Sequence, residues 1–221
     1  SFLRSDDKGE SMRLFNGPSG TPNVDKLEEK KDVKSLIKAL KNEDENIRGK
    51  AMHALGKIRD KKAVEPLIEA LKNEDAEIKW KAAVALGKIG DDEAVEALIA
   101  ALEDENVRSN AAISLGEIGD KRSVKPLIQA LRHDNSEFRG YLVEALGMIG
   151  DKEAVPLLIA ALKDENISIR KHAAGALGRI GDEKAIDPLL EDLNDERWYV
   201  RVHVEEALKA IEIKTGKKIE Y

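Results

Sequence analysis

The strongest constraint on the fold is a Leu-Gly phrase that recurs along the chain. It recurs every 31 residues, with a single interval of 29 between Gly87 and Gly116. A second landmark is the leucine of phrases such as "PLIEAL", which appears once for each Leu-Gly. The two series are Leu55-Gly56, Leu86-Gly87, Leu115-Gly116, Leu146-Gly147, Leu177-Gly178 and Leu208-Lys209, and Leu36, Leu67, Leu98, Leu127, Leu158 and Leu189. The chain is therefore predicted to contain six copies of one two-segment unit.

Each segment has the apolar spacing of a helix. The stretches "AVEPLIEAL" (63–71) and "IKWKAAVALGKIG" (78–90) both place apolar residues three and four apart. The turn between them ends in Asp44 or Asp75, whose carboxylate is expected to cap the second helix. A glycine followed by an aspartate is expected to end each second helix in the left-handed conformation and to cap the next helix. These pairs are Gly90-Asp91, Gly119-Asp120, Gly150-Asp151 and Gly181-Asp182.

A single hairpin cannot bury its own apolar stripes, but stacked hairpins bury them against their neighbours. We therefore expect an all-α solenoid over residues 23–221, with partial helices capping both ends. The third repeat is two residues shorter between Leu102 and Val107, which predicts a local change in stacking there. Residues 1–22 are expected to form a flexible tail. Met12 as the natural start, with residues 1–11 added by cloning, remains an open alternative.

Composition restricts the function classes. Charged residues make up 36% of the 221 and aromatic residues 4%, and there is no cysteine to form a disulfide, a thiolate metal site or a nucleophile. A net charge of -6 argues against a general nucleic-acid binder. No apolar run approaches the roughly 20 residues that cross a bilayer. We therefore expect a cytoplasmic protein that binds neither nucleic acid nor membrane.

The unit "DKKAVEPLIEALKNEDAEIKWKAAVALGKIG" (60–90) resembles the short HEAT-like repeat of the phycobilisome lyase type. The resemblance extends over about residues 32–211 and recurs in all six copies. It implies a right-handed superhelix of two-helix repeats of about 31 residues, in which the second helices line the concave surface. Most members of this class are interaction scaffolds, and some are enzymes.

Equivalent positions in successive second helices should form rows across the surface. One row is basic in every repeat and consists of Arg48, Lys79, Arg108, Arg139, Arg170 and Arg201. We interpret it as a stacking device that pairs with capping aspartates or carbonyl groups of adjacent repeats. An anion-binding track is the alternative interpretation.

The neighbouring rows vary, as a partner-binding surface would. They hold large apolar residues where solvation favours Lys or Glu, while Gly140 and Gly175 weaken their helices without a reason in helix propensity. A basic patch flanks the first half. The predicted groove residues are Trp80, Val84, Ile113, Tyr141, Met148, Lys50, Lys57, Lys81, Lys88 and His172. This pattern predicts a protein or peptide partner, acidic and amphipathic. The alternative is that Trp80 and Tyr141 merely lean on neighbouring hairpins.

Enzyme signatures are weak. His172 and His203 are row neighbours that could share a metal, but the sequence shows no carboxylate shell around them. Deoxyhypusine hydroxylase, built on similar repeats, binds iron through repeated His-Glu pairs, whereas the residues after these two histidines are Ala173 and Val204. We therefore expect no catalytic residue, metal or cofactor, and predict a non-enzymatic scaffold. A metal oxidoreductase like the hydroxylase and a bilin lyase-like protein remain the alternatives.

Overall fold

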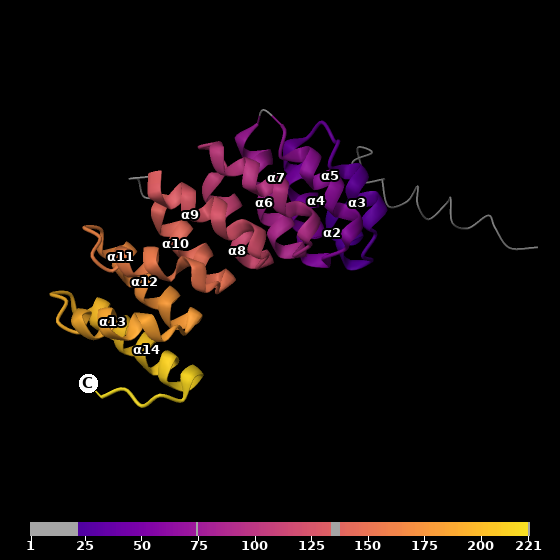
Figure 1. The fold of residues 1–221 in the computed structure, drawn as a ribbon. Helices are drawn as coiled ribbons and strands as arrows, with labels where there is room; N and C mark the ends of the chain where they lie inside the picture. The colour runs from indigo at the N-terminus through magenta and orange to yellow at the C-terminus, as the bar shows by residue number, and fades with distance from the viewer. Residues whose placement is uncertain (1–21, 74, 134–137, 221) are drawn as a thin grey trace, which may run out of the picture. The chain divides into compact units, whose positions relative to one another are not determined.

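The computed structural model describes residues 22–73, 75–133 and 138–220, and these form helices joined by short turns, with no strand among them (Figure 1). The predicted tail, apart from Pro22, lies outside the described residues. The chain divides into two compact units, residues 1–94 and 95–221.

The first unit contains two helical hairpins preceded by a short helix. Its elements are α2 (Val24–Glu29), α3 (Val33–Ala39), α4 (Glu45–Ile58), η1 (Lys61–Ala63), α5 (Val64–Ala70), α6 (Ala76–Ile89) and η2 (Asp92–Ala94), the η elements being 3-10 turns. The second helices α4 and α6 pack side by side, and α3 and α5 each pack on the second helix of their own hairpin. Helix α2 packs on α3 and α4 and buries Val24 and Leu27.

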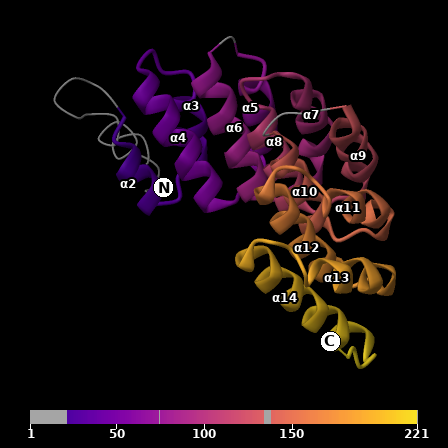
Figure 2. The ribbon, with the colours of Figure 1, turned by 90° about the vertical axis from the view of Figure 1, so that its left-hand side faces the viewer.

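The second unit contains the other four hairpins (Figure 2). Its second helices form one layer in which each packs on the next, and each first helix packs on its own partner. The elements are α7 (Val95–Ala100), η3 (Ala101–Glu103), α8 (Arg108–Ile118), η4 (Lys121–Ser123), α9 (Val124–His133), α10 (Phe138–Ile149), η5 (Lys152–Ala154), α11 (Val155–Ala161), α12 (Ile167–Ile180), η6 (Glu183–Ala185), α13 (Ile186–Asp192) and α14 (Trp198–Thr215).

The helix ends follow the predicted chemistry with one difference. Asp44 and Asp75 cap α4 and α6, and the Asp75 carboxylate accepts a hydrogen bond from the Glu77 amide at 2.7 Å. The four predicted glycines end their helices with φ of 73–74°, in the left-handed region. The aspartate after each glycine does not cap the α-helix itself. It caps a 3-10 turn that leads into the helix, as Asp120 does by accepting from the Arg122 amide at 2.8 Å.

The shortened third repeat differs from the others. Helix α7 passes into the 3-10 turn η3, and α8 has 11 residues where α4, α6 and α12 have 14. Val107 precedes α8 and provides no side-chain cap. The boundary between the two units, after Ala94, falls where this repeat begins.

The Leu-Gly phrase marks where second helices approach most closely. A Cβ atom added to Gly147 would lie 2.8 Å from the Cα of Ala176 on the next second helix, and one added to Gly178 would lie 2.8 Å from the Cα of Ala207. Real side chains do not fit at that distance. Glycine therefore recurs in the phrase because the backbones of adjacent repeats meet there.

Candidate functional site

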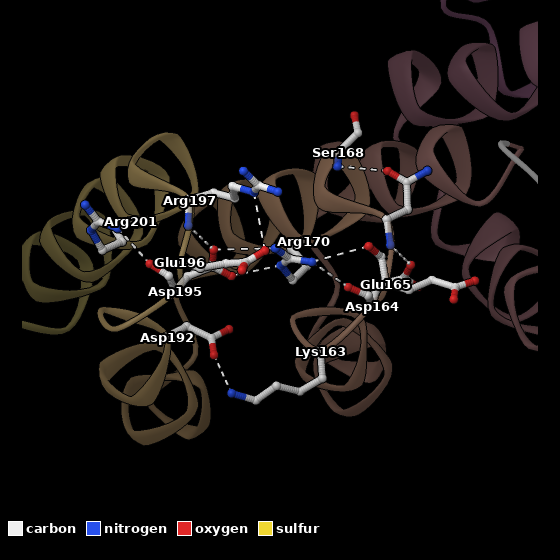
Figure 3. A network of polar contacts seen from close by, with 11 residues as sticks. Lys163, Asp164, Glu165, Ser168, Arg170, Asp192, Asp195, Glu196, Arg197 and Arg201 are labelled. Atoms are coloured by element: carbon white, nitrogen blue, oxygen red, sulfur yellow. Dashed lines mark hydrogen bonds and ion pairs between the residues drawn. The ribbon is translucent and has the colours of Figure 1, made fainter.

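The arginines of the basic row are half-buried and make contacts within the chain. Three of its arginines donate a hydrogen bond from Nη1 to the carbonyl oxygen six residues earlier, at 2.7–2.9 Å, in the turn of their own repeat: Arg48 to Asn42, Arg170 to Asp164 and Arg201 to Asp195. Two arginines of the row reach the next repeat: Arg139 pairs with Asp164, and the Nε of Arg170 donates to the Asp195 carboxylate at 2.8 Å. Figure 3 shows Arg170 between these two turns.

These contacts support the interpretation of the row as a stacking device, with one correction. The aspartates belong to the next repeat, as predicted, but they lie two residues before the N-caps of α12 and α14, and the carbonyl groups belong to the arginine's own turn. Burial alone would raise the pKa of Asp195, but hydrogen bonds from the Arg197 amide and Arg170 lower it overall. Arg108 adds an aromatic contact, because its guanidinium lies 4.6 Å from the centre of the Phe138 ring in the next repeat.

A second series of ion pairs joins repeats at the opposite turns. The lysine after a capping aspartate reaches the capping aspartate of the next repeat: Lys61 to Asp91 at 2.8 Å, Lys121 to Asp151 at 3.1 Å and Lys152 to Asp182 at 3.5 Å. The hydrogen bond from Lys61, together with one from the Glu93 amide, lowers the pKa of Asp91. The sequence analysis assigned these aspartates only as caps, although the lysine beside them was a signal for the pairing.

The predicted groove residues fall on both units. In the first unit Trp80 is 39% exposed, and the Nζ of Lys81 lies 5.5 Å from the centre of its ring. The predicted basic patch is partly neutralised within the chain, because Lys81 pairs with Glu77 and Lys57 pairs with Glu28. Val84 and Lys88 are half-buried and Lys50 is exposed.

Several side chains of these rows lie over a glycine of the preceding repeat. A Cβ atom added to Gly56 would lie 3.4 Å from the Cδ of Lys88, and one added to Gly116 would lie 3.1 Å from the Sδ of Met148. Met148 remains 38% exposed, and Ile113 is half-buried. Met148 thus combines a packing role with an exposed apolar surface.

Tyr141 and His172 line one pocket between α10 and α12. The pocket has a volume of about 400 Å³ and is lined by Gly140, Tyr141, Glu144, Asn166, Ser168, Ile169 and His172. Tyr141 is 44% exposed. The Nδ1 atom of His172 is buried and has no hydrogen-bond partner among the described residues. Burial, and secondarily the charge of Lys171, lowers the pKa of His172, while Glu144 acts in the opposite direction.

The glycine opposite His172 keeps this pocket open. Gly49 and Gly140 occupy equivalent positions, and Lys81 and His172 of the following repeats lie over them. A Cβ on Gly49 would collide with the Lys81 side chain, whereas a Cβ on Gly140 would have His172 Nδ1, at 3.7 Å, as its sole neighbour within 4 Å. Lys81 therefore fills the space over Gly49 in the first unit, whereas His172 leaves space over Gly140 in the second.

The sequence analysis missed a second exposed aromatic group, at the start of α14. Trp198 is 67% exposed and meets Tyr199 edge to face at 5.7 Å, and Val202 lies one turn further along the helix. The signal was present in the sequence as "RWYVRV", since two adjacent aromatic residues open a second helix there.

Two kinds of site find no support in the part of the chain that the structure describes. No three His, Asp, Glu or Cys side chains there are close enough together to hold a metal ion. No helix in those segments has the length and apolarity to span a bilayer.

Comparison with known proteins identifies the repeat. A model of HEAT repeats matches in four overlapping segments: residues 33–106, 64–139, 99–151 and 124–209. The chain belongs to the HEAT repeat family. The predicted resemblance and the predicted all-α solenoid fold are thereby confirmed. A comparison with curated protein sequences gives no match.

Solved structures share the fold of this HEAT repeat protein. The complex of CpcE and CpcF of phycocyanin lyase from Nostoc sp. PCC7120 is 24% identical, with a TM-score of 0.52, over 81% of this chain and 94% of that one. A designed armadillo repeat protein in complex with the peptide (KR)4 is 19% identical, with a TM-score of 0.58, over 81% of this chain and 99% of that one. An engineered protein is 24% identical, with a TM-score of 0.56, over 86% of this chain and 99% of that one.

Proposed function

We propose that this HEAT repeat protein is a non-enzymatic scaffold that binds a protein or peptide through the exposed face of its second helices. The observation that supports it most is the contrast between neighbouring rows. The arginine row is used in internal contacts, whereas Trp80 and Tyr141 on the adjacent rows keep over a third of their surface exposed. Exposed aromatic residues are typical anchors of binding surfaces.

Two patches provide the contacts, one on each unit. On α4 and α6, Trp80, Val84, Lys50 and Lys88 combine an aromatic anchor with positive charge, which suits an acidic amphipathic segment. Lys57 and Lys81 add less charge than the sequence suggests, because each already pairs with a glutamate. On α10 and α12 the contact is the pocket beside Tyr141, with Ile113 and Met148 on the same layer of helices.

Affinity capture from native lysate tests this proposal when it is followed by binding measurements on the recovered partner. We expect Trp80→Ala and Tyr141→Ala each to weaken the affinity for that partner, because each removes an exposed anchor. Ile213→Ala is the matched control, since Ile213 is 83% exposed on α14 but belongs to neither patch. If both aromatic variants bind the partner as tightly as wild type, the assignment of Trp80 and Tyr141 to the binding surface is refuted. A bound pigment or a stoichiometric metal in the purified protein would favour the enzymatic alternatives instead.

A further inference from the structure

We infer that the pocket between α10 and α12 receives the guanidinium group of an arginine side chain from the bound partner. This inference rests on the proposed scaffold function and specifies the ligand at one of its patches. Its basis is the chemistry of the lining: a carboxylate at Glu144, an exposed aromatic ring at Tyr141, a hydroxyl at Ser168 and a buried nitrogen without a partner at His172.

Two groups of the lining accept hydrogen bonds, and Glu144 brings the negative charge. The Glu144 carboxylate can only accept hydrogen bonds, and the neutral His172 ring offers Nδ1 as an acceptor in the tautomer that carries its proton on Nε2. The lowered pKa of His172 keeps the ring neutral at pH 7. Arginine presents five donors in a planar group that also stacks on aromatic rings, so one residue can meet Glu144 and Tyr141 together. Nδ1 is buried in this conformation and can accept from the same group once the imidazole ring turns.

The cations nearby do not occupy this position. Lys171 and Arg179 on α12 and His203 on α14 act on the His172 charge, but none of them lines the pocket. Arg179 extends toward Gly147, where its Nη1 lies 3.3 Å from an added Cβ position. His203 contacts Glu206 at 3.0 Å. Among residues 22–73, 75–133 and 138–220 no cation pairs with the Glu144 carboxylate, so it is available to a cation of the partner.

Gly140 leaves space over the His172 ring. An added Cβ at Gly140 would lie 3.7 Å from Nδ1 and within 4 Å of no other side chain or adjoining helix, so a methyl group at this position would narrow the pocket. Gly140→Ala fills that room without a clash and replaces a poor helix former with a good one. Gly175→Ala makes the same exchange on α12 at a site with nothing within 4 Å, which makes it a matched control.

Titration of the isotope-labelled full chain with N-acetyl-arginine methylamide, followed by NMR, tests the inference. We expect saturable shifts at amides of α10 and α12, and an affinity about tenfold or more above that for the citrulline analogue, which has the same shape without the charge. Glu144→Gln and Gly140→Ala should each lower the affinity by a similar factor, and Gly175→Ala should not change it. The lysine and glutamate analogues complete the series, and the glutamate analogue should not bind.

The pH dependence gives a second readout. As the pH falls below 6.5 the affinity should fall, because His172 becomes protonated and repels the cationic ligand. His172→Gln, which keeps an acceptor, should remove that fall. Equal binding of arginine and citrulline, or unchanged arginine binding by Gly140→Ala and Glu144→Gln, would overturn the inference. If partner affinity still depends on Tyr141 in that case, the scaffold proposal stands without it. If arginine binds as expected but Trp80→Ala and Tyr141→Ala bind the partner as tightly as wild type, the scaffold proposal fails instead.

Discussion

Substitution of Gly147 by alanine tests how the repeats pack. A Cβ at this position would lie 2.6 Å from the Cβ and 2.8 Å from the Cα of Ala176, so α10 and α12 would have to separate. Gly175→Ala on α12 serves as the control, because an added Cβ there meets no neighbouring side chain or helix within 4 Å. The two variants make the same chemical change in a helix interior and differ only in the clash.

The expected magnitudes have opposite signs. Glycine to alanine in a helix interior stabilises by about 0.8–1 kcal/mol. Overpacking of a close-packed site costs about 1–3 kcal/mol, and a contact with backbone belongs in the upper part of that range. Gly147→Ala should therefore destabilise by about 1–2 kcal/mol, and Gly175→Ala should stabilise by up to about 1 kcal/mol.

Urea unfolding followed by circular dichroism measures both changes, and hydrogen exchange of α10 and α12 locates them. Because adjacent repeats stabilise each other, the loss at Gly147 should appear as faster exchange on both helices. Two variants with the same stability change, or a stabilised Gly147→Ala, would refute the claim that backbone approach explains the recurrent Leu-Gly phrase.

Three further predictions concern the contacts between and within repeats. Arg170→Ala should lower the free energy of unfolding in urea by about 3 kcal/mol or more. The side chains of Arg170 and Asp195 are only 12% and 10% exposed, and the carboxylate would lose its partner. The exposed pair of Arg197 and Glu196 supplies the control, since Arg197→Ala should cost less than about 1 kcal/mol. Asp75→Ala should cost about 0.5–2 kcal/mol, since the amides of Glu77 and Ile78 lose their cap, and an unchanged urea midpoint would contradict this. The pKa values of Asp91, Asp151 and Asp182 are lowered, so their contribution to the free energy of unfolding is complete above about pH 4 and is lost below it. The lowered pKa of His172 predicts a separate loss of stability below about pH 6.5, and this loss should be absent in His172→Gln.

The helices and their ends could be predicted from the sequence because their causes are local. Gly90 ends α6 through its own left-handed backbone, and Asp75 caps the same helix through amides two and three residues away. The glycine-aspartate pair recurs in four repeats, which strengthened the signal. The basic row could also be interpreted, because a cation recurs at this position in all six repeats, although the aspartates that pair with Arg139 and Arg170 do not recur in every repeat.

The site could be predicted only in part, because its shape depends on side chains from adjacent repeats. The sequence placed Tyr141 and His172 on one face, and Gly140 was noted as an unexplained helix glycine. Whether the residue over such a glycine fills the space, as Lys81 does over Gly49, or leaves a pocket, as His172 does over Gly140, depends on rotamers that no local pattern specifies. The pairing of Lys57 with Glu28 likewise depends on where α2 docks.

The most direct test of the scaffold account is to map where a bound partner contacts the chain. Peptides selected from a display library on the wild-type protein, and verified by calorimetry, can be titrated into the labelled chain and followed by NMR. The account predicts that amide shifts concentrate on the second helices, at Trp80 on α6 and around the pocket between α10 and α12. Shifts confined to the first helices α5, α9, α11 and α13 would contradict it.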